Sequence, residues 1–357
     1  MLDSPQRPPA MICHLLVPHL AAPAATGAES FGRIELPALE MLMARGKHAR
    51  FGGASIERWL AAAFRVDSGA TLALAPFALR GEGCDPGSHA WLCADPVHLR
   101  IEAGRAILAD ASRFAITADE ARQMVKALNA HFAERNLAFL APVPQRWYAR
   151  AASAPRIRTT PTAEVSGNDI TPHLPAGDDQ VYWRGVLNEA QMLLHAHACN
   201  ERREQRGEIA VNSLWFWGAG VETPPDPSPR YHAVWSDHPL ARGLGVSSGI
   251  ETRPLPASGA DFLRHAARAG GPKDALHLLV LPPPQDASRA GPDAWREALA
   301  HLERDWFAPL FAATLEGTIS AVTLVAVGAA GGWSAAFTRG DRLKFWRRRK
   351  RVSEYLA

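Results

Sequence analysis

The chain has 357 residues, enough for one large α/β domain with an insertion or for two or three smaller domains. Its apolar share of 47% and its formal charge of +3 support neither a disordered chain nor a protein that binds nucleic acid over its whole surface. The four cysteines lack the C-x-x-C spacing of a zinc or redox site, and no segment is apolar enough to span a bilayer, so we expect a cytoplasmic protein.

The first half of the chain predicts one strand and two helices, followed by a compact α+β module. The apolar run 11–17 predicts a buried strand, and apolar side chains recur at helical spacing in 36–46 and 55–64. The module is expected to contain two strands joined at a turn, a helix with a capping box, a further strand and an exit loop, over 90–110, 117–135, 138–151 and 153–179.

The second half predicts alternating helices and buried strands. The expected order is helix, strand, strand, helix and strand, over 186–207, 211–220, 277–284, 293–315 and 319–332. Continuous runs rich in Val and Leu, separated by a helix, are typical of parallel strands that are buried on both faces. The fold class that follows is α/β, with a mostly parallel sheet flanked by helices and a small inserted α+β module.

This fold class suggests three parts of the chain. The α/β domain is expected to be discontinuous, over 1–85 and 176–338. The inserted module with its exit loop is expected over 86–175, and a basic C-terminal tail over 339–357.

The stretch VNSLWFWGAG at 211–220 is a candidate edge of a ligand pocket. Alternation along a strand places both tryptophans on one face, where we expect them to pack against the preceding helix, and the phenylalanine on the other. The glycines would allow a turn at the carboxyl end of the strand, the edge where open α/β sheets bind ligands. The candidate residues are Asn212, Trp215, Trp217, Gly218 and Gly220.

Two arginines and a polar helix stripe are candidates for binding an anion. Arg100 and Arg146 lie on or just beyond apolar strands, where a guanidinium group could grip a carboxylate or a phosphate; arginines on an exposed strand face would give the same pattern. His195 shares a helix face with Asn188, which could line a pocket or satisfy a buried loop.

Metal ligands are weakly indicated. Asp237 and His238 form the only tight Asp-His pair, but the serine before them and the proline after them also suit the start of a helix. With His277 and Asp286 they are the only candidates for an altered metal site.

A dense run of positive charge occupies the tail. Trp346 beside it could stack on nucleic-acid bases or lie at a lipid headgroup interface, and a solvated basic helix end would look the same. The basic residues are Lys344, Arg347, Arg348, Arg349, Lys350 and Arg351.

The order of several tracts resembles the RpfE-type regulatory protein family of bacteria. These tracts are ADPVHLRIEAGRAILAD at 94–110, QRWYARA at 145–151, LPAG at 174–177, and the long tract 187–220. The same order is more distantly similar to archaeal-type cofactor-independent phosphoglycerate mutases of the alkaline phosphatase superfamily. In those mutases an Asn-x-x-Arg helix element, here Asn200 to Arg203, precedes a Trp-x-Trp-Gly-x-Gly strand end.

This resemblance implies a degenerate alkaline-phosphatase-like fold. By the same resemblance, Arg100 and Arg146 would contact a substrate phosphate, and Asn200 and Arg203 join the anion-binding candidates. The mutases carry an aspartate at the end of their first strand, whereas HLLVPHLAAP has none, and LVAVGAAGG lacks the Asp-His pair of a later strand. Two-metal catalysis needs such ligands.

The resemblance therefore favours a non-catalytic regulatory protein, without a cofactor, that binds a small phosphorylated or carboxylated metabolite or a protein partner. No catalytic residue is assigned. The alternative is an active phosphomutase or phosphatase with two divalent metals, manganese or zinc, held by Asp237, His238, His277 and Asp286.

Overall fold

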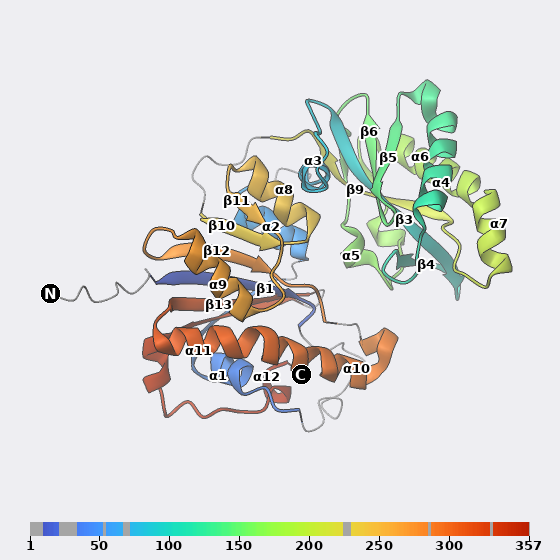
Figure 1. Ribbon diagram of the computed structural model, residues 1–357. Coiled ribbons are helices and arrows are strands. Elements are labelled where there is room, and N and C mark those ends of the chain that lie inside the picture. The colour runs from blue at the N-terminus through green and yellow to red at the C-terminus, as the bar shows by residue number, and fades with distance from the viewer. Residues whose placement is uncertain are drawn as a thin grey trace. The chain divides into compact units, whose positions relative to one another are not determined.

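The computed structural model describes residues 10–20, 34–52, 55–66, 72–223, 230–284, 287–328 and 331–356, and the side chains of all of these except 287–292 and 356. The chain forms two compact units (Figure 1). Unit 1 comprises Met1–Trp59, Ser228–Gly245 and Gly249–Ala357, and unit 2 comprises Leu60–Pro227 and Val246–Ser248.

Unit 1 is built on a seven-stranded sheet in the order β11-β10-β12-β1-β13-β14-β2. The first five strands of this order run parallel, and β14 and β2 add antiparallel pairings at one edge. The expected mostly parallel sheet is confirmed. The strands are β1 (Met11–Pro18), β2 (Lys47–Phe51), β10 (Ala233–Ser236), β11 (Glu251–Arg253), β12 (Ala275–Val280), β13 (Ile319–Val327) and β14 (Gly332–Thr338).

Helices cover the sheet of unit 1, and one face of it forms a continuous apolar core. Leu15 of β1 and Leu324 of β13 point into this core and meet Leu39, Phe262 and Leu310 from three helices. The helices are α1 (Pro37–Arg45), α8 (Pro239–Ser247), α9 (Gly259–Ala269), α10 (Ala287–Leu302), α11 (Ala308–Glu316) and α12 (Ser353–Leu356), with α2 (Ile56–Ala63) at the boundary between the units.

A buried carboxylate fixes the start of α1. Leu36 precedes this helix and offers no side-chain cap. Instead Glu303, in the π-helical turn between α10 and α11, accepts hydrogen bonds from the backbone N–H of Ala38 at 2.6 Å and of Leu39 at 3.1 Å. The carboxylate thus satisfies two of the donors that a helix N-terminus leaves without partners.

Unit 2 is built on an antiparallel sheet in which β3 pairs with three other strands. The order is β4-β3-β6-β5, and β9 pairs with β3 as well. Figure 1 shows β3 and β9 side by side although they are far apart in the chain. The strands are β3 (Ala90–Glu102), β4 (Arg105–Asp110), β5 (Ala138–Val143), β6 (Arg146–Ala151) and β9 (Ser213–Gly220), with a separate pair β7 (Ile157–Arg158) and β8 (Ala176–Gly177).

One face of this sheet is covered by α4 and α6. Leu92 and Phe216 point to that face, where they meet Leu128 of α4 and Val186 of α6 in a second core. The helices of unit 2 are α3 (Ala75–Gly81), α4 (Ala118–Phe132), α5 (Thr162–Val165), α6 (Gln180–His195) and α7 (Ala198–Gln205). The opposite face of the sheet carries polar side chains, which form the candidate site.

Two expected elements are each divided in the structure. The strand expected over 138–151 is the hairpin β5–β6, with its turn at Pro144, which has no N–H to donate to a ladder. The helix expected over 186–207 is broken between α6 and α7, because the His197 side chain accepts a hydrogen bond from the N–H of Cys199 and starts a new helix.

The boundary between the units also differs from the expected one. We expected 176–338 to belong with 1–85, but the structure places α6, α7 and β9 in unit 2. The physical reason is the antiparallel pairing of β9 with β3, from Val97↔Ser213 to Trp91↔Gly220. The second unit is therefore larger than the module of 86–175.

Among the described residues, no helix has the length and apolarity needed to cross a membrane.

Two histidines in the sheet of unit 1 are held neutral. Burial lowers the pKa of both His14 and His277 from the ordinary value of 6.5 to about 4, and the charges of Arg230 and His232, respectively, act in the same direction. Between pH 4 and 6.5 the unfolded chain therefore binds protons at these positions that the folded chain does not bind. Stability is lost as the pH falls through this window.

We expect the free energy of unfolding to fall by on the order of 2 kcal/mol per histidine between pH 7 and pH 5. His277→Phe should remove its share of this loss, because a phenylalanine takes up no proton on unfolding. The measurement is urea unfolding followed by circular dichroism at both pH values. His301→Phe, at an exposed position, is the control; an unchanged pH dependence in His277→Phe contradicts the assignment.

Candidate functional site

A carboxylate in the middle of β3 is the centre of the candidate site. Asp95 accepts hydrogen bonds from the indole N–H of Trp217 at 2.7 Å and from the hydroxyl group of Thr162. Burial raises the pKa of Asp95 from 3.8 to about 6, although both hydrogen bonds and the charge of Arg146 oppose this rise. A carboxyl group with such a pKa changes its charge near neutral pH, as groups at functional sites often do.

An arginine lies beside this carboxylate. The register that pairs Cys93 with Tyr148 brings the start of β6 alongside Asp95. Arg146 there forms a two-point ion pair with Glu82, in which its Nη2 donates to Oε2 at 3.1 Å and its Nε donates to Oε1. The Glu82 side chain is 7% exposed, whereas that of Arg146 is 43% exposed. Solvent thus reaches one guanidinium group next to two carboxylates.

The tryptophans of β9 tie a loop to this same face. Trp215 donates from its indole N–H to the carbonyl of Thr160 at 2.8 Å, and the N–H of Gly218 donates to the hydroxyl of Thr159 at 3.2 Å. With the bond from Trp217 to Asp95, β9 holds the segment that leads into α5. The indoles therefore bind protein groups through their N–H donors.

The expected alternation along β9 is confirmed, but the assignment of its two faces is reversed. Phe216, not the tryptophans, packs against the preceding helix, with its ring centroid 5.4 Å from that of Trp183 on α6. Trp215 and Trp217 lie on the face of Asp95 because they alternate with Phe216. Sequence periodicity separates the two faces but does not say which one the helix covers.

The two glycines of β9 make room for protein backbone. Gly218 has φ +68°, and a Cβ atom there would lie 3.0 Å from the backbone nitrogen of Ala75. A Cβ atom on Gly220 would lie 2.3 Å from the Cβ of Ala73. The glycines thus allow the segment that begins α3 to lie against the strand. Asn212, the other candidate of this stretch, bonds both backbone groups of Leu99 and extends the pairing with β3.

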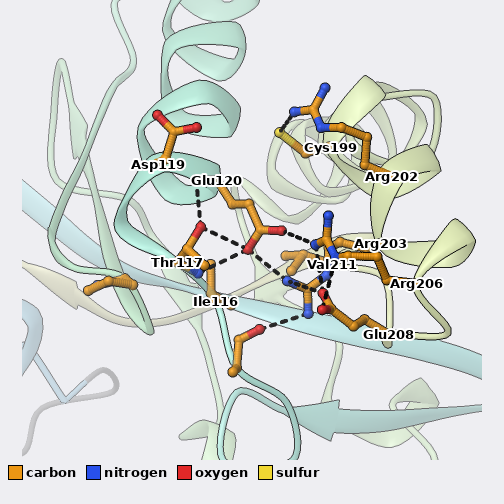
Figure 2. A network of polar contacts seen from close by, with 12 residues as sticks. Ile116, Thr117, Asp119, Glu120, Cys199, Arg202, Arg203, Arg206, Glu208 and Val211 are labelled. Atoms are coloured by element: carbon orange, nitrogen blue, oxygen red, sulfur yellow. Dashed lines mark hydrogen bonds and ion pairs between the residues drawn. The ribbon is translucent and has the colours of Figure 1, made fainter.

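Asn200 and Arg203 are enclosed by protein partners (Figure 2 shows the surroundings of Arg203). The side chain of Asn200 donates to the carbonyls of Leu194 and Val211 and accepts from the N–H of Val211. Arg203 is 1% exposed, and its Nε, Nη1 and Nη2 donate to the Ile209 carbonyl, the Glu120 carboxylate and the Ala115 carbonyl. The Asn-x-x-Arg element fastens α7 to the start of α4 in this structure.

Glu120 holds the centre of that network. Its carboxylate accepts from the N–H of Thr117 at 2.9 Å, completing the capping box of α4, and from Arg206 at 2.7 Å. Burial would raise the pKa of Glu120, but the Thr117 N–H and the arginines hold it below its ordinary value. The ion pair between Glu120 and Arg203 is buried on both sides, so removing either partner would leave a charge without compensation.

The remaining anion-binding candidates lie away from Asp95. Asn188 and His195 are exposed on α6. Arg100 is exposed and forms an ion pair with Glu102 at 3.0 Å. It lies five residues beyond Asp95 on β3, roughly 16 Å along the strand, and alternation turns it to the opposite face. The structure does not bring Arg100 and Arg146 together.

Three of the four weak metal candidates, Asp237, His238 and His277, lie among the described residues. His277 contacts the ring of Phe262, and its Nδ1 accepts from the indole of Trp235 at 3.3 Å. Asp237 and His238 precede α8, as the start-of-helix interpretation expects, and Asp286 lies outside the described residues. In the part of the chain that the structure describes, no three His, Cys, Asp or Glu side chains are placed to hold a metal.

Asp95, Glu82 and Thr162 are site residues that the sequence patterns did not indicate. One signal was available, because Asp95 interrupts the apolar run AWLCADPV, where a charged group needs partners. No local pattern could indicate Glu82 or Thr162, since they reach the site through tertiary packing.

The raised pKa of Asp95 predicts a pH-dependent effect of Asp95→Asn. The folded protein binds an extra proton between pH 3.8 and 6, so the stability from this group is present in acid and lost as the pH rises through about 6. The neutral amide avoids this loss. We expect the variant to exceed the wild type by on the order of 2 kcal/mol at pH 7.5 and to approach it at pH 4.5 in urea unfolding. Asp178→Asn, at an exposed position, should show no such trend; equal effects at both pH values would refute the assignment.

Arg203 is expected to be structural. Arg203→Met should destabilise unit 2 by about 3–5 kcal/mol, because it leaves the buried Glu120 carboxylate without its partner. Arg202→Met, one position earlier and exposed, is the matched control, with an expected loss below about 1 kcal/mol. Thermal unfolding measures both, and a similar loss in the two variants would contradict this role.

No protein-family model matches the chain. It is 35% identical over 143 residues to the 2,3-bisphosphoglycerate-independent phosphoglycerate mutase of Methanothrix thermoacetophila, covering 36% of each chain. It is 31% identical over 186 residues to the 2,3-bisphosphoglycerate-independent phosphoglycerate mutase 2 of Methanothermobacter thermautotrophicus, covering 48% of this chain and 46% of the relative. The chain thus matches less than half the length of these curated relatives.

Solved structures extend the likeness over nearly the whole chain. The cofactor-independent phosphoglycerate mutase from Thermoplasma acidophilum has a TM-score of 0.50 and 16% identity, covering 96% of this chain and 94% of its own. The PH0037 protein from Pyrococcus horikoshii has a TM-score of 0.58 and 14% identity, covering 97% and 92%. At these identities the structural likeness shows the fold. The chain is a distant relative of the 2,3-bisphosphoglycerate-independent phosphoglycerate mutases, with their alkaline-phosphatase-like fold.

Proposed function

We propose that this chain is a non-catalytic, phosphomutase-like regulatory protein of the RpfE type that binds a small phosphorylated or carboxylated metabolite at Arg146. The observation that supports a binding site is the half-exposed guanidinium group of Arg146, which lies beside the buried carboxyl groups of Asp95 and Glu82. A planar guanidinium group recognises carboxylate and phosphate oxygens through paired hydrogen bonds.

The ends of three of the five parallel strands, β1, β12 and β13, support a role without turnover. The residues after β1 are His19 and Leu20, and β12 is followed by Leu281 and three prolines, 282–284. Gly328 follows β13. Two-metal phosphoryl transfer needs several carboxylates and imidazoles to offset the charge of the ions. The described ends of β1, β12 and β13 supply one histidine, and β10 is followed by Asp237 and His238.

Binding at Arg146 would compete with an internal ligand. Glu82 already takes the Nε and Nη2 donors of this arginine. An incoming anion must share the guanidinium group with Glu82 or displace it, and the released carboxylate can then move. Such an exchange would couple ligand binding to the position of residues near α3, as a regulatory protein requires.

A binding experiment can distinguish the two candidate arginines, Arg146 and Arg100, because they lie on opposite faces of the sheet. We expect Arg146→Gln to weaken the binding of 3-phosphoglycerate or inorganic phosphate about 10- to 100-fold, because it removes charge-assisted hydrogen bonds. Glu82→Gln should strengthen binding, since the competing charge is lost. Arg100→Gln, on the opposite face, is the matched control and should bind like the wild type. Isothermal titration calorimetry measures all four affinities.

Assays of mutase and phosphatase turnover distinguish the proposed non-catalytic protein from an active enzyme. The purified chain is expected to show neither mutase nor phosphatase activity with added manganese. Stoichiometric tightly bound metal, together with turnover that Asp286→Ala abolishes, would establish the alternative with a metal site at Asp237, His238, His277 and Asp286. Unchanged affinity in Arg146→Gln would overturn the proposed binding site.

A further inference from the structure

The segment 339–351 of unit 1 concentrates positive charge and exposed apolar surface. It contains eight basic residues and one acidic residue, a formal charge of +7, whereas the rest of the chain carries −4. Three apolar side chains in it are exposed to solvent, Leu343 by 66%, Phe345 by 78% and Trp346 by 66%. We call this segment the basic–aromatic loop.

Backbone contacts with α1 hold the basic–aromatic loop in place. Its first turn is closed by a capping box between Thr338 and Asp341. Arg45, at the end of α1, donates to the carbonyl of Arg342 at 2.5 Å, and Arg347 donates to the carbonyl of Gly46 at 3.1 Å. These contacts fix the ends of the short stretch that carries the exposed apolar side chains.

A buried anchor follows the loop. Val352 is 1% exposed, and its N–H donates to Glu40 of α1 at 3.1 Å. The same carboxylate forms an ion pair with Arg349 at 3.3 Å. Figure 1 shows α12, which begins at Ser353, close to α1. Leu343, Phe345 and Trp346 are therefore displayed by an anchored loop.

Some of the basic side chains of the loop are paired with carboxylates, and others are exposed. Lys344, Arg349 and Lys350 form ion pairs with Asp341, Glu40 and Glu354. Arg348 and Arg351 are exposed and follow the exposed apolar side chains in sequence. Apolar side chains beside such arginines match a surface that is anionic outside and apolar beneath.

The geometry of the rings favours a membrane over a nucleic acid. Base stacking needs open, flat ring faces. The rings of Phe345 and Trp346 meet edge to face, with centroids 5.3 Å apart and planes at 81°, so they do not form one flat platform for successive bases. The third exposed group, Leu343, has no ring to stack. Leucine, phenylalanine and tryptophan together are the side chains that enter the boundary between headgroups and acyl chains, while arginine contacts lipid phosphates.

We propose that the basic–aromatic loop binds the surface of an anionic phospholipid membrane, with Leu343, Phe345 and Trp346 inserted at the interface and Arg348 and Arg351 on the phosphates. This site is independent of Arg146 and of the proposed metabolite binding.

Co-sedimentation of the full chain with phospholipid vesicles tests the proposal. We expect binding to vesicles of phosphatidylcholine and phosphatidylglycerol, and not to phosphatidylcholine alone. Phe345→Ser/Trp346→Ser should abolish binding, and Arg348→Gln/Arg351→Gln should weaken it about 25-fold, at about fivefold per arginine. Binding should weaken as salt is raised. Ile101→Ser, at an equally exposed apolar position of unit 2, and Arg122→Gln, at an exposed arginine, should bind like the wild type.

The depth of insertion is measured by quenching with brominated phospholipids. Quenching of tryptophan fluorescence is expected in the wild type and should be largely lost in Trp346→Phe, which retains an apolar ring. Absence of vesicle binding by the wild type overturns the proposal. Vesicle binding that survives Phe345→Ser/Trp346→Ser also overturns it, as does binding to a single-stranded oligonucleotide that requires Trp346 while anionic vesicles are not bound.

Discussion

The antiparallel pairing of β9 with β3 is the constraint on which unit 2 depends. It joins segments more than one hundred residues apart, from Val97↔Ser213 to Trp91↔Gly220. The pairing brings Trp217 to Asp95 and Trp215 to the loop before α5, so one strand both completes the sheet and holds the candidate site. It also carries α6 and α7 into unit 2, which moves the boundary between the units beyond the compact module that the local patterns suggested.

Two buried carboxylates in unit 2, Glu120 and Asp95, have pKa values shifted in opposite directions because their partners differ. Glu120 is neutralised by Arg203 and Arg206, and its pKa stays below the ordinary value. Asp95 receives only neutral hydrogen bonds, its pKa rises to about 6, and the nearby Arg146 is shared with Glu82. The first arrangement fixes helices in place. The arrangement around Asp95 places a carboxyl group whose charge changes with pH beside the accessible guanidinium group of Arg146. Such groups are common at functional sites.

Unit 1 is built on a parallel sheet whose stability comes from apolar contacts. The five parallel strands and their helices depend on apolar runs, and the core extends to Leu20 and Leu281, just beyond the ends of β1 and β12. Likeness in fold therefore does not by itself establish likeness in chemistry. The exposed apolar and basic side chains of unit 1 that we propose to bind a membrane lie on the basic–aromatic loop, which is anchored to α1 through Glu40 and Gly46.

The sequence by itself determined the α/β class, the buried strand β1, the parallel strands β12 and β13, the capping box of α4 and the alternation of Trp215, Phe216 and Trp217. These features follow from periodicity and from contacts between neighbours in the chain, which a sequence records directly. Only the tertiary structure decided that the helix covers the Phe216 face, that Asn200 and Arg203 are enclosed by protein partners, and that Arg100 and Arg146 point to opposite faces of the sheet. It also brought Glu82 and Thr162 to the face of Asp95. Each of these depends on a pairing between distant strands or helices, and no local pattern specifies which distant partner a strand will take.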